Sequence, residues 1–175
     1  MAGTLDQSAT VGGGNNYFGR SDRLYAHQGF TPSVSGKCTQ IDVDLKIGAG
    51  SPTGTIFCYL YTDNGADKPG TLIATINSMA ASSLTASYVF YSFSIDANIA
   101  PQITKNTKYH IVLLRTPADD ANYVHWDADT AGGYAAGQSG HSGDGLSWTN
   151  DAGIDNDFKQ YYTILSGGGF LLNFV

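Results

Sequence analysis

The sequence contains no glutamate, so all fifteen of its acidic residues are aspartates. Glutamate favours helix interiors, whereas aspartate, asparagine, serine and glycine compete with the helical backbone and gather in turns. With 22 glycines, 11 tyrosines and 8 phenylalanines, this composition argues against a helical bundle, a coiled coil or a doubly wound α/β enzyme. It predicts strands joined by turns.

Charge of either sign is scarce, at 14% of residues, and the nine lysines and arginines are scattered singly. A nucleic-acid-binding protein needs a basic stripe to neutralise phosphates, so the sequence predicts no nucleic-acid partner. The longest apolar cluster, residues 170–175, is too short to span a bilayer, and no membrane partner is expected. Residues 1–10 lack the charged start and the apolar run of a signal peptide. We therefore expect a soluble chain with a formal net charge of −6.

Cysteine is also rare, with only Cys38 and Cys58 present. If the strands that hold them form a hairpin around residues 48–54, Cys58 lies opposite residue 44. Cys38 is then on the order of 20 Å away along the strand, which is beyond the reach of a disulfide. We expect two free, partly buried thiols.

Alternation of apolar and polar side chains marks the strands. Residues 41–47 alternate with a period of two, which predicts a strand with one solvated face. In residues 56–62 the aromatic side chains of Phe57, Tyr59 and Tyr61 alternate with aliphatic residues, so we expect both faces of this strand to be covered. Further strands are predicted at residues 71–76, 88–95, 109–115, 122–127, 157–162 and 170–175.

Short strands separated by Gly, Asp and Asn turns are typical of a β-sandwich. We predict an all-β fold, a two-sheet antiparallel β-sandwich resembling a jelly roll, over residues 25–162. Residues 1–24 are rich in Gly, Asn and Ser and are predicted to form an extended N-terminal arm. Residues 163–175 are predicted to form a Gly-hinged apolar tail or strand.

An ordered series of short motifs runs from residue 28 to residue 162. It comprises Gln28-Gly-Phe-Thr-Pro32, Val34-Ser-Gly36, Gly50-Ser-Pro-Thr-Gly54, Tyr59-Leu-Tyr-Thr-Asp63, Lys68-Pro-Gly-Thr-Leu72, Ala81-Ser-Ser-Leu84, Thr107-Lys-Tyr-His-Ile-Val-Leu113, Tyr123-Val-His-Trp126, Gly132-Gly-Tyr134 and Asp144-Gly-Leu-Ser-Trp148. This series resembles the choice-of-anchor R domains of bacterial surface proteins and phage structural proteins. The resemblance implies a non-catalytic jelly-roll module, and it implies the fold far better than the function.

Candidate catalytic groups do not assemble into a familiar pattern. The segment Gly137-Gln-Ser139-Gly-His141 is close to a nucleophile elbow in its letters, but histidine replaces the final glycine and no strand-to-helix context surrounds it. A glycosidase would need two facing carboxylates, and the pairs Asp127 with Asp129 and Asp155 with Asp157 are more typical of turn acids. We therefore expect no enzymatic activity and no cofactor.

Calcium prefers six to eight oxygen ligands, which aspartates and loop carbonyls can supply. The candidate ligands are Asp151, Asp155 and Asp157, although their segment lacks the spacing and the terminal glutamate of an EF-hand loop. We therefore predict no metal site, with a structural calcium ion at these three aspartates as an alternative.

A sugar site is the other candidate, because pyranose rings stack on flat aromatic side chains beside polar groups. Trp148, with Asn150 and Asp151 beside it, lies in a predicted loop, and Tyr134 lies in the same long region. The alternative for Trp148 is a loop plug that anchors this Gly-rich segment. Trp126 lies within a predicted strand and is expected in the core.

The C-terminal tail carries the leading functional hypothesis. An exposed apolar strand tends to pair with a neighbour's edge, so the tail is predicted to drive self-association. Its apolar residues are Phe170, Leu171, Leu172, Phe174 and Val175. We expect a structural protein on the surface of a bacteriophage virion, as a capsid decoration, fibre or tail component whose partners are further copies and neighbouring virion proteins. The alternatives are a secreted or cell-surface carbohydrate-binding module and, third, a hydrolase.

Overall fold

Two antiparallel sheets make up the fold, and the computed structural model describes residues 3–164 of the chain. The eight-stranded sheet consists of β1 (Thr4–Ala9), β14 (Phe158–Thr163), β4 (Gly36–Ile47), β10 (Val124–Asp129) and β13 (Asp155–Asn156), with β2 (Gly14–Phe18) on β10 and with β7 (Val89–Ser94) and β8 (Gln102–Ile103) on β4. The six-stranded sheet runs in the order β12 (Thr149–Asn150), β11 (Ser139–Ser142), β3 (Tyr25–Phe30), β9 (Tyr109–Thr116), β5 (Thr55–Asp63) and β6 (Pro69–Ala80).

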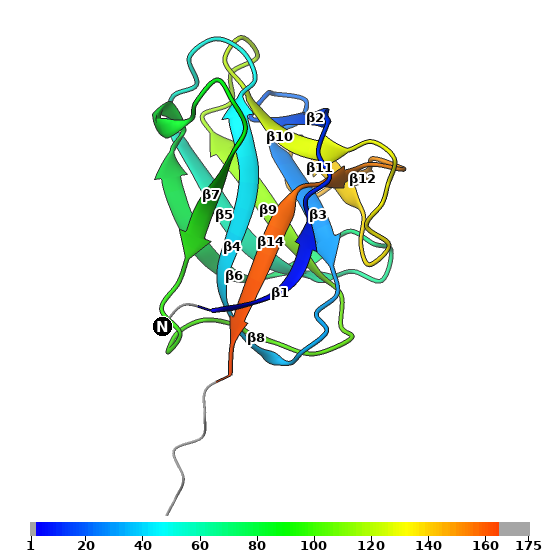
Figure 1. The fold of residues 1–175 in the computed structure, drawn as a ribbon. Helices are drawn as coiled ribbons and strands as arrows, with labels where there is room; N and C mark the ends of the chain where they lie inside the picture. The colour runs from blue at the N-terminus through cyan, green and yellow to red at the C-terminus, as the bar shows by residue number, and fades with distance from the viewer. Residues whose placement is uncertain (1–2, 165–175) are drawn as a thin grey trace, which may run out of the picture.

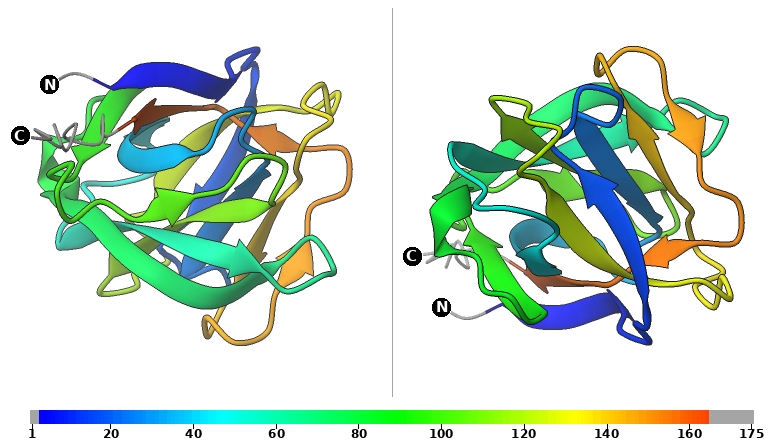
Figure 2. Two further views of the ribbon diagram at one scale, coloured as in Figure 1. Left: turned by 90° about the horizontal axis from the view of Figure 1, so that it is seen from below. Right: turned by 90° about the horizontal axis from the view of Figure 1, so that it is seen from above.

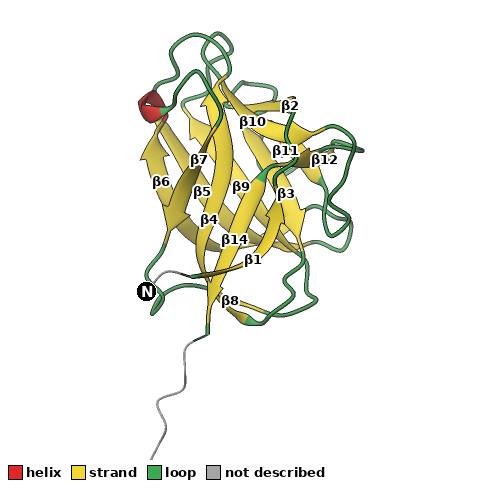
Figure 3. Ribbon diagram, viewed as in Figure 1, coloured by secondary structure: helices red, strands yellow, loops and turns green. Residues whose placement is uncertain are grey.

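The sheets lie face to face as two layers, as Figures 1 and 2 show. Among the described residues, the helical structure is confined to the 3₁₀ turn η1 (Ala81–Ser83), drawn in red in Figure 3. The predicted all-β, two-sheet antiparallel β-sandwich is therefore confirmed.

The core lies between the inner faces of the sheets. Alternate residues of the central strands are fully buried there, including Val43 and Leu45 of β4 and Ile56 and Leu60 of β5. Burial of each such side chain contributes about 1.5–3 kcal/mol. Trp126 of β10 is also fully buried, so its predicted place in the core is confirmed.

The N-terminal segment differs from the extended arm expected for residues 1–24. Strand β1 pairs with β14, and β2 pairs with β10, so residues 4–18 belong to the eight-stranded sheet. Ala9 and Phe18 enter the core cluster. The backbone of these Gly- and Asn-rich residues supplies the pairing, which their side chains did not indicate.

The hairpin considered for the two cysteine-bearing strands does not form, because β4 and β5 belong to different sheets. The expected state of the cysteines is nevertheless confirmed, since Cys38 and Cys58 are both free and buried. Burial raises the pKa of Cys38 to about 12, so this thiol is inert at neutral pH. The predicted assembly residues Phe170, Leu171, Leu172, Phe174 and Val175 lie outside the described residues.

Candidate functional site

The outer face of the six-stranded sheet carries an unusual set of aromatic side chains. Residues directly opposite each other in antiparallel strands point to the same side. Tyr25 lies opposite Leu114, which lies opposite Phe57, and Val112 of β9 lies between His27 of β3 and Tyr59 of β5. Tyr61 continues the series along β5. We call Tyr25, Phe57, Tyr59, Tyr61 and Trp148 the aromatic face.

The rings of the aromatic face contact one another in a defined geometry. Phe57 and Tyr59 are parallel to within 11°, with their centroids 5.9 Å apart, and Tyr61 meets Tyr59 edge-on at 6.4 Å. Trp148 lies edge-on to Tyr25 at 5.9 Å and to His27 at 5.3 Å. Such pairs add about 0.5–1.5 kcal/mol each beyond the area that they bury.

No strand of the described residues lies over the aromatic face. The expectation that both faces of residues 56–62 are covered is therefore wrong for the outer face, where Phe57, Tyr59 and Tyr61 are only half-buried. Val112 points to the same side and is fully buried, because the surrounding side chains close over it. The aromatic residues thus form the molecular surface themselves.

The residues that flank these rings on β6 and β12 are polar and uncharged. The residues of β6 opposite Phe57 and Tyr59 are Ser78 and Thr75, and Asn150 of β12 points to the same side as His27. Burial raises the pKa of Tyr59, and the nearby phenol of Tyr25 adds to the rise. The phenol of Tyr59 therefore stays neutral at physiological pH.

A glycine allows the close approach of His27 to the outer strands. A Cβ at Gly140 would collide with Nε2 of His27 and with the carbonyl oxygen of Thr149. Because the position is occupied by glycine, the His27 ring fits between β11 and Trp148 and is fully buried.

The buried side chains of His27 and His110 form a hydrogen-bonded chain with the partly exposed Asp63. His110 Nε2 lies 2.8 Å from Asp63 Oδ1, and His110 Nδ1 lies 3.2 Å from His27 Nδ1. If Asp63 accepts the Nε2 proton, His110 Nδ1 must accept a hydrogen bond from His27 Nδ1. His27 Nε2 is then a buried lone pair, and it has no partner among the described residues.

This histidine pair predicts a loss of stability in mild acid. Burial lowers the pKa of His27 well below its usual value, and it also lowers the pKa of His110. The unfolded chain therefore binds these protons more readily, so stability is full above pH ~6.5 and falls as the pH drops below it. His27→Asn cannot be protonated at this position. Denaturant titrations should show that the variant is less stable than the wild type at pH 7.5 and that this difference in the free energy of unfolding shrinks as the pH is lowered to 5. A deficit that stays constant would contradict the assignment.

The residues predicted for a sugar site separate into two groups. Trp148 and Asn150 lie on or beside the aromatic face. Tyr134 instead packs its ring against Phe158 and donates its hydroxyl to Gln7, while Asp151 is held by Arg23 at 3.1 Å and by His141 at 3.0 Å. The structure therefore places Trp148 and Tyr134 in different surroundings. Sequence reasoning also missed Tyr25 as part of the face, although the alternation of residues 56–62 did indicate the aromatic side chains of β5.

The three candidate calcium ligands also lie in different surroundings. Asp155 accepts hydrogen bonds from Gln28 Nε2 and Tyr134 N, so it holds a loop in place. Asp157 clusters with two aspartates of neighbouring strands, Asp44 and Asp127, and one oxygen from each of the three lies within 4.8 Å of the others. The predicted trio of Asp151, Asp155 and Asp157 does not converge on one point.

The cluster of Asp44, Asp127 and Asp157 has an electrostatic cost. Burial raises the pKa of Asp157 to about 6 despite a hydrogen bond from the Gly12 backbone, and the other two carboxylates add to the rise. Asp63, Asp67 and His110 form a second group of potential metal ligands within 4.8 Å. There Lys108 lies 2.8 Å from Asp67 and balances its charge.

The segment that resembles a nucleophile elbow lies in a strand. Ser139 begins β11, and its hydroxyl is buried without a hydrogen-bond partner among the described residues. His141 instead contacts Asp151. Ser139 and His141 therefore do not form the hydrogen bond that would activate a serine nucleophile.

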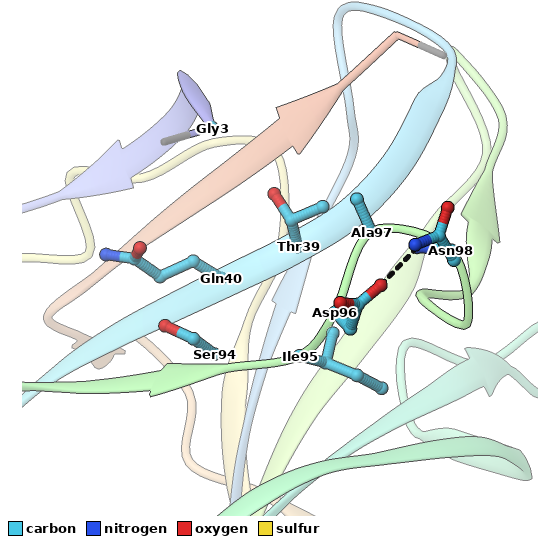
Figure 4. A pocket seen from close by; sticks show the side chains of 8 residues that line it. All are labelled: Gly3, Thr39, Gln40, Ser94, Ile95, Asp96, Ala97 and Asn98. Atoms are coloured by element: carbon cyan, nitrogen blue, oxygen red, sulfur yellow. Dashed lines mark hydrogen bonds between the residues drawn. The ribbon is translucent and has the colours of Figure 1, made fainter. Parts of the chain in front are cut away.

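One cavity lies away from the aromatic face, beside β4 and the turn after β7. Its volume is about 300 Å³, and it is lined by Gly3, Thr39, Gln40, Ser94, Ile95, Asp96, Ala97 and Asn98 (Figure 4). The carboxylate of Asp96 accepts a hydrogen bond from the backbone of Asn98 at 2.8 Å, which closes the turn. With Asp96 as the single ionisable lining residue, the cavity holds no acid–base pair.

Comparisons with known proteins add no family to this geometry. No protein-family model matches the chain, and the search of curated proteins finds no match. The resemblance to choice-of-anchor R domains therefore stays a prediction. Within residues 3–164, no helix is long and apolar enough to cross a membrane.

Proposed function

We propose that the protein is a non-catalytic structural protein of a bacteriophage particle and that it self-associates through strand β6. One observation carries this proposal. The strand is 12 residues long, it ends the six-stranded sheet, and none of its residues is charged. A long, uncharged edge strand is a ready template for pairing with a second chain.

The free edge of β6 has apolar side chains and little protection. Leu72 and Ile73 are exposed, at 48% and 37%. Three register shifts in the pairing with β5 bend the strand, and Asn77 donates a hydrogen bond to the Ser94 carbonyl at the end of β7. Monomeric proteins commonly place lysine on such an edge, and here it is absent.

The place on a virion rests on the resemblance of the sequence to phage structural domains, and the net charge of −6 would keep assembled particles dispersed. The partners would be further copies of this chain and neighbouring virion proteins. The apolar residues 170–175, which the sequence predicts to serve the same purpose, lie outside the described residues.

A charge on the edge should prevent the association. We expect the purified full-length chain to form an oligomer whose mass, measured by light scattering during gel filtration, exceeds that of the 18.5 kDa monomer. Ile73→Lys should shift this population to the monomer, because the ammonium group would be desolvated in a paired edge.

Ile99→Lys is the matched control, since Ile99 is 73% exposed and lies in a turn outside the strands. This variant should keep the wild-type mass. A wild-type chain that is monomeric at every concentration, or two variants that behave alike, would refute the role of β6.

A further inference from the structure

We propose that the aromatic face binds a neutral polysaccharide chain, and that it does so independently of the self-association through β6. The face supplies what a chain of pyranose rings requires, namely several aromatic rings in one continuous surface with free hydroxyl groups between them. All strands of the described residues belong to the two packed sheets, so no strand covers this surface.

The rings are arranged for an extended ligand. Phe57, Tyr59 and Tyr61 follow one another at every second residue of β5, and neighbouring rings are 5.9 and 6.4 Å apart. Tyr25 and Trp148 continue the surface across the sheet from β5. A single sugar would contact only part of this surface, whereas a chain would lie over several rings.

The hydroxyl groups of the face are free to bind. Those of Tyr25, Tyr59 and Tyr61 make no hydrogen bond within residues 3–164, while Tyr88 and Tyr134, outside the face, each have a partner. A phenol hydroxyl both donates and accepts, so it matches sugar hydroxyls in either role. Thr75, Ser78 and Asn150 border the rings with further polar groups.

The absence of charged residues from the rows of the face favours neutral over anionic polysaccharides. The three cross-strand rows of the face carry no Lys, Arg or Asp, so no group there would pair with a carboxylate or a sulfate. The net charge of −6 repels an anionic chain further. The expected ligand is therefore neutral and rich in hydroxyl groups.

Native gel electrophoresis through soluble polysaccharide tests the proposal with the full chain. Hydroxyethylcellulose and galactomannan are the neutral probes, and alginate is the anionic one. We expect at least one neutral probe to retard the wild-type protein and alginate not to retard it. Titration with the same probe should change the fluorescence of Trp148, since Trp126 is fully buried.

Variants at the centre of the face sharpen the test. Tyr59→Ala should weaken binding about tenfold or more, because it removes the ring between Phe57 and Tyr61. Tyr59→Phe should lose less, since it keeps the ring. Tyr161→Ala is the matched control, because Tyr161 is a half-buried tyrosine of β14 on the other sheet, and it should bind as the wild type does.

The binding test is repeated with Ile73→Lys, so that a failure of self-association does not affect it. Absence of retardation by both neutral probes, retardation by alginate alone, or equal binding by Tyr59→Ala would overturn the proposal. A fall in the oligomer mass of Tyr59→Ala without any polysaccharide binding would also overturn it, and would assign the face to a protein partner.

Discussion

Trp126→Ala is expected to lower the free energy of unfolding by about 3–5 kcal/mol. The indole is fully buried in β10, between β2 and β4, and it is the largest fully buried side chain. Its Nε1 donates a 2.7 Å hydrogen bond to the backbone carbonyl of Asp157. The substitution therefore leaves a cavity in the core and removes the shorter of the two hydrogen bonds that this carbonyl accepts, the other coming from the Asp44 backbone at 3.3 Å.

Guanidinium titrations followed by circular dichroism would measure this loss. Trp126→Phe keeps most of the volume and removes the donor, so it should lose less than the alanine variant. Trp148→Ala is the control on the surface, where the ring is only partly buried, and its loss should be smaller still. Equal losses at positions 126 and 148 would show that Trp126 does not anchor the core as described.

The core position of Trp126 could be predicted because periodicity reports which face of a strand is buried. The alternation of residues 41–47 likewise identified the inner face of β4, where Val43 and Leu45 are fully buried. This information is local, since each strand shows its own period of two. The fold class follows from it directly.

Strand pairing is not local, and there the sequence was a poor guide. A turn at residues 48–54 fits a hairpin as well as a crossing between sheets, and the chain crosses from β4 to β5. Strand β2 pairs through the backbone of Gly14 and Asn15, whose side chains carry no strand signal. Composition therefore predicted an arm where the backbone forms a sheet.

The candidate site shows the same division. The aromatic side chains of β5 were visible as an alternation, but Tyr25 and Trp148 reach the same face from distant parts of the chain. Tyr134 was grouped with Trp148 because the two share a loop region, yet its ring packs against Phe158. The sequence analysis considered pairs of aspartates two residues apart. In the structure, Asp157 instead lies close to Asp44 and Asp127, which belong to other strands.

Asp157→Asn is expected to stabilise the protein by about 3 kcal/mol at pH 8. Asp157 is 2% exposed, and burial, with the nearby carboxylates, raises its pKa to about 6 from the usual 3.8. A folded-state pKa above the unfolded value means that the folded protein favours the protonated acid. The contribution of Asp157 to stability is complete below pH ~4 and is lost as the pH rises through 6. The gain in the free energy of unfolding of Asp157→Asn over the wild type should therefore shrink to a small fraction at pH 4.

Asp144→Asn should change stability in the opposite direction at neutral pH. This loop carboxylate accepts backbone hydrogen bonds from Ser147 and Leu146 at 2.8 Å, which lower its pKa to about 2. The stabilisation by the Asp144 charge is present above the unfolded pKa and is lost as the pH falls towards 2.

The effects of His27 and Asp157 on stability fall in the same acidic pH range and have opposite signs, so the pH profile of the wild type contains both. The difference in the free energy of unfolding between Asp157→Asn and the wild type at each pH isolates the effect of the Asp157 carboxylate. An asparagine variant at position 157 that gains nothing at pH 8 would mean that this carboxylate is not strained by its neighbours.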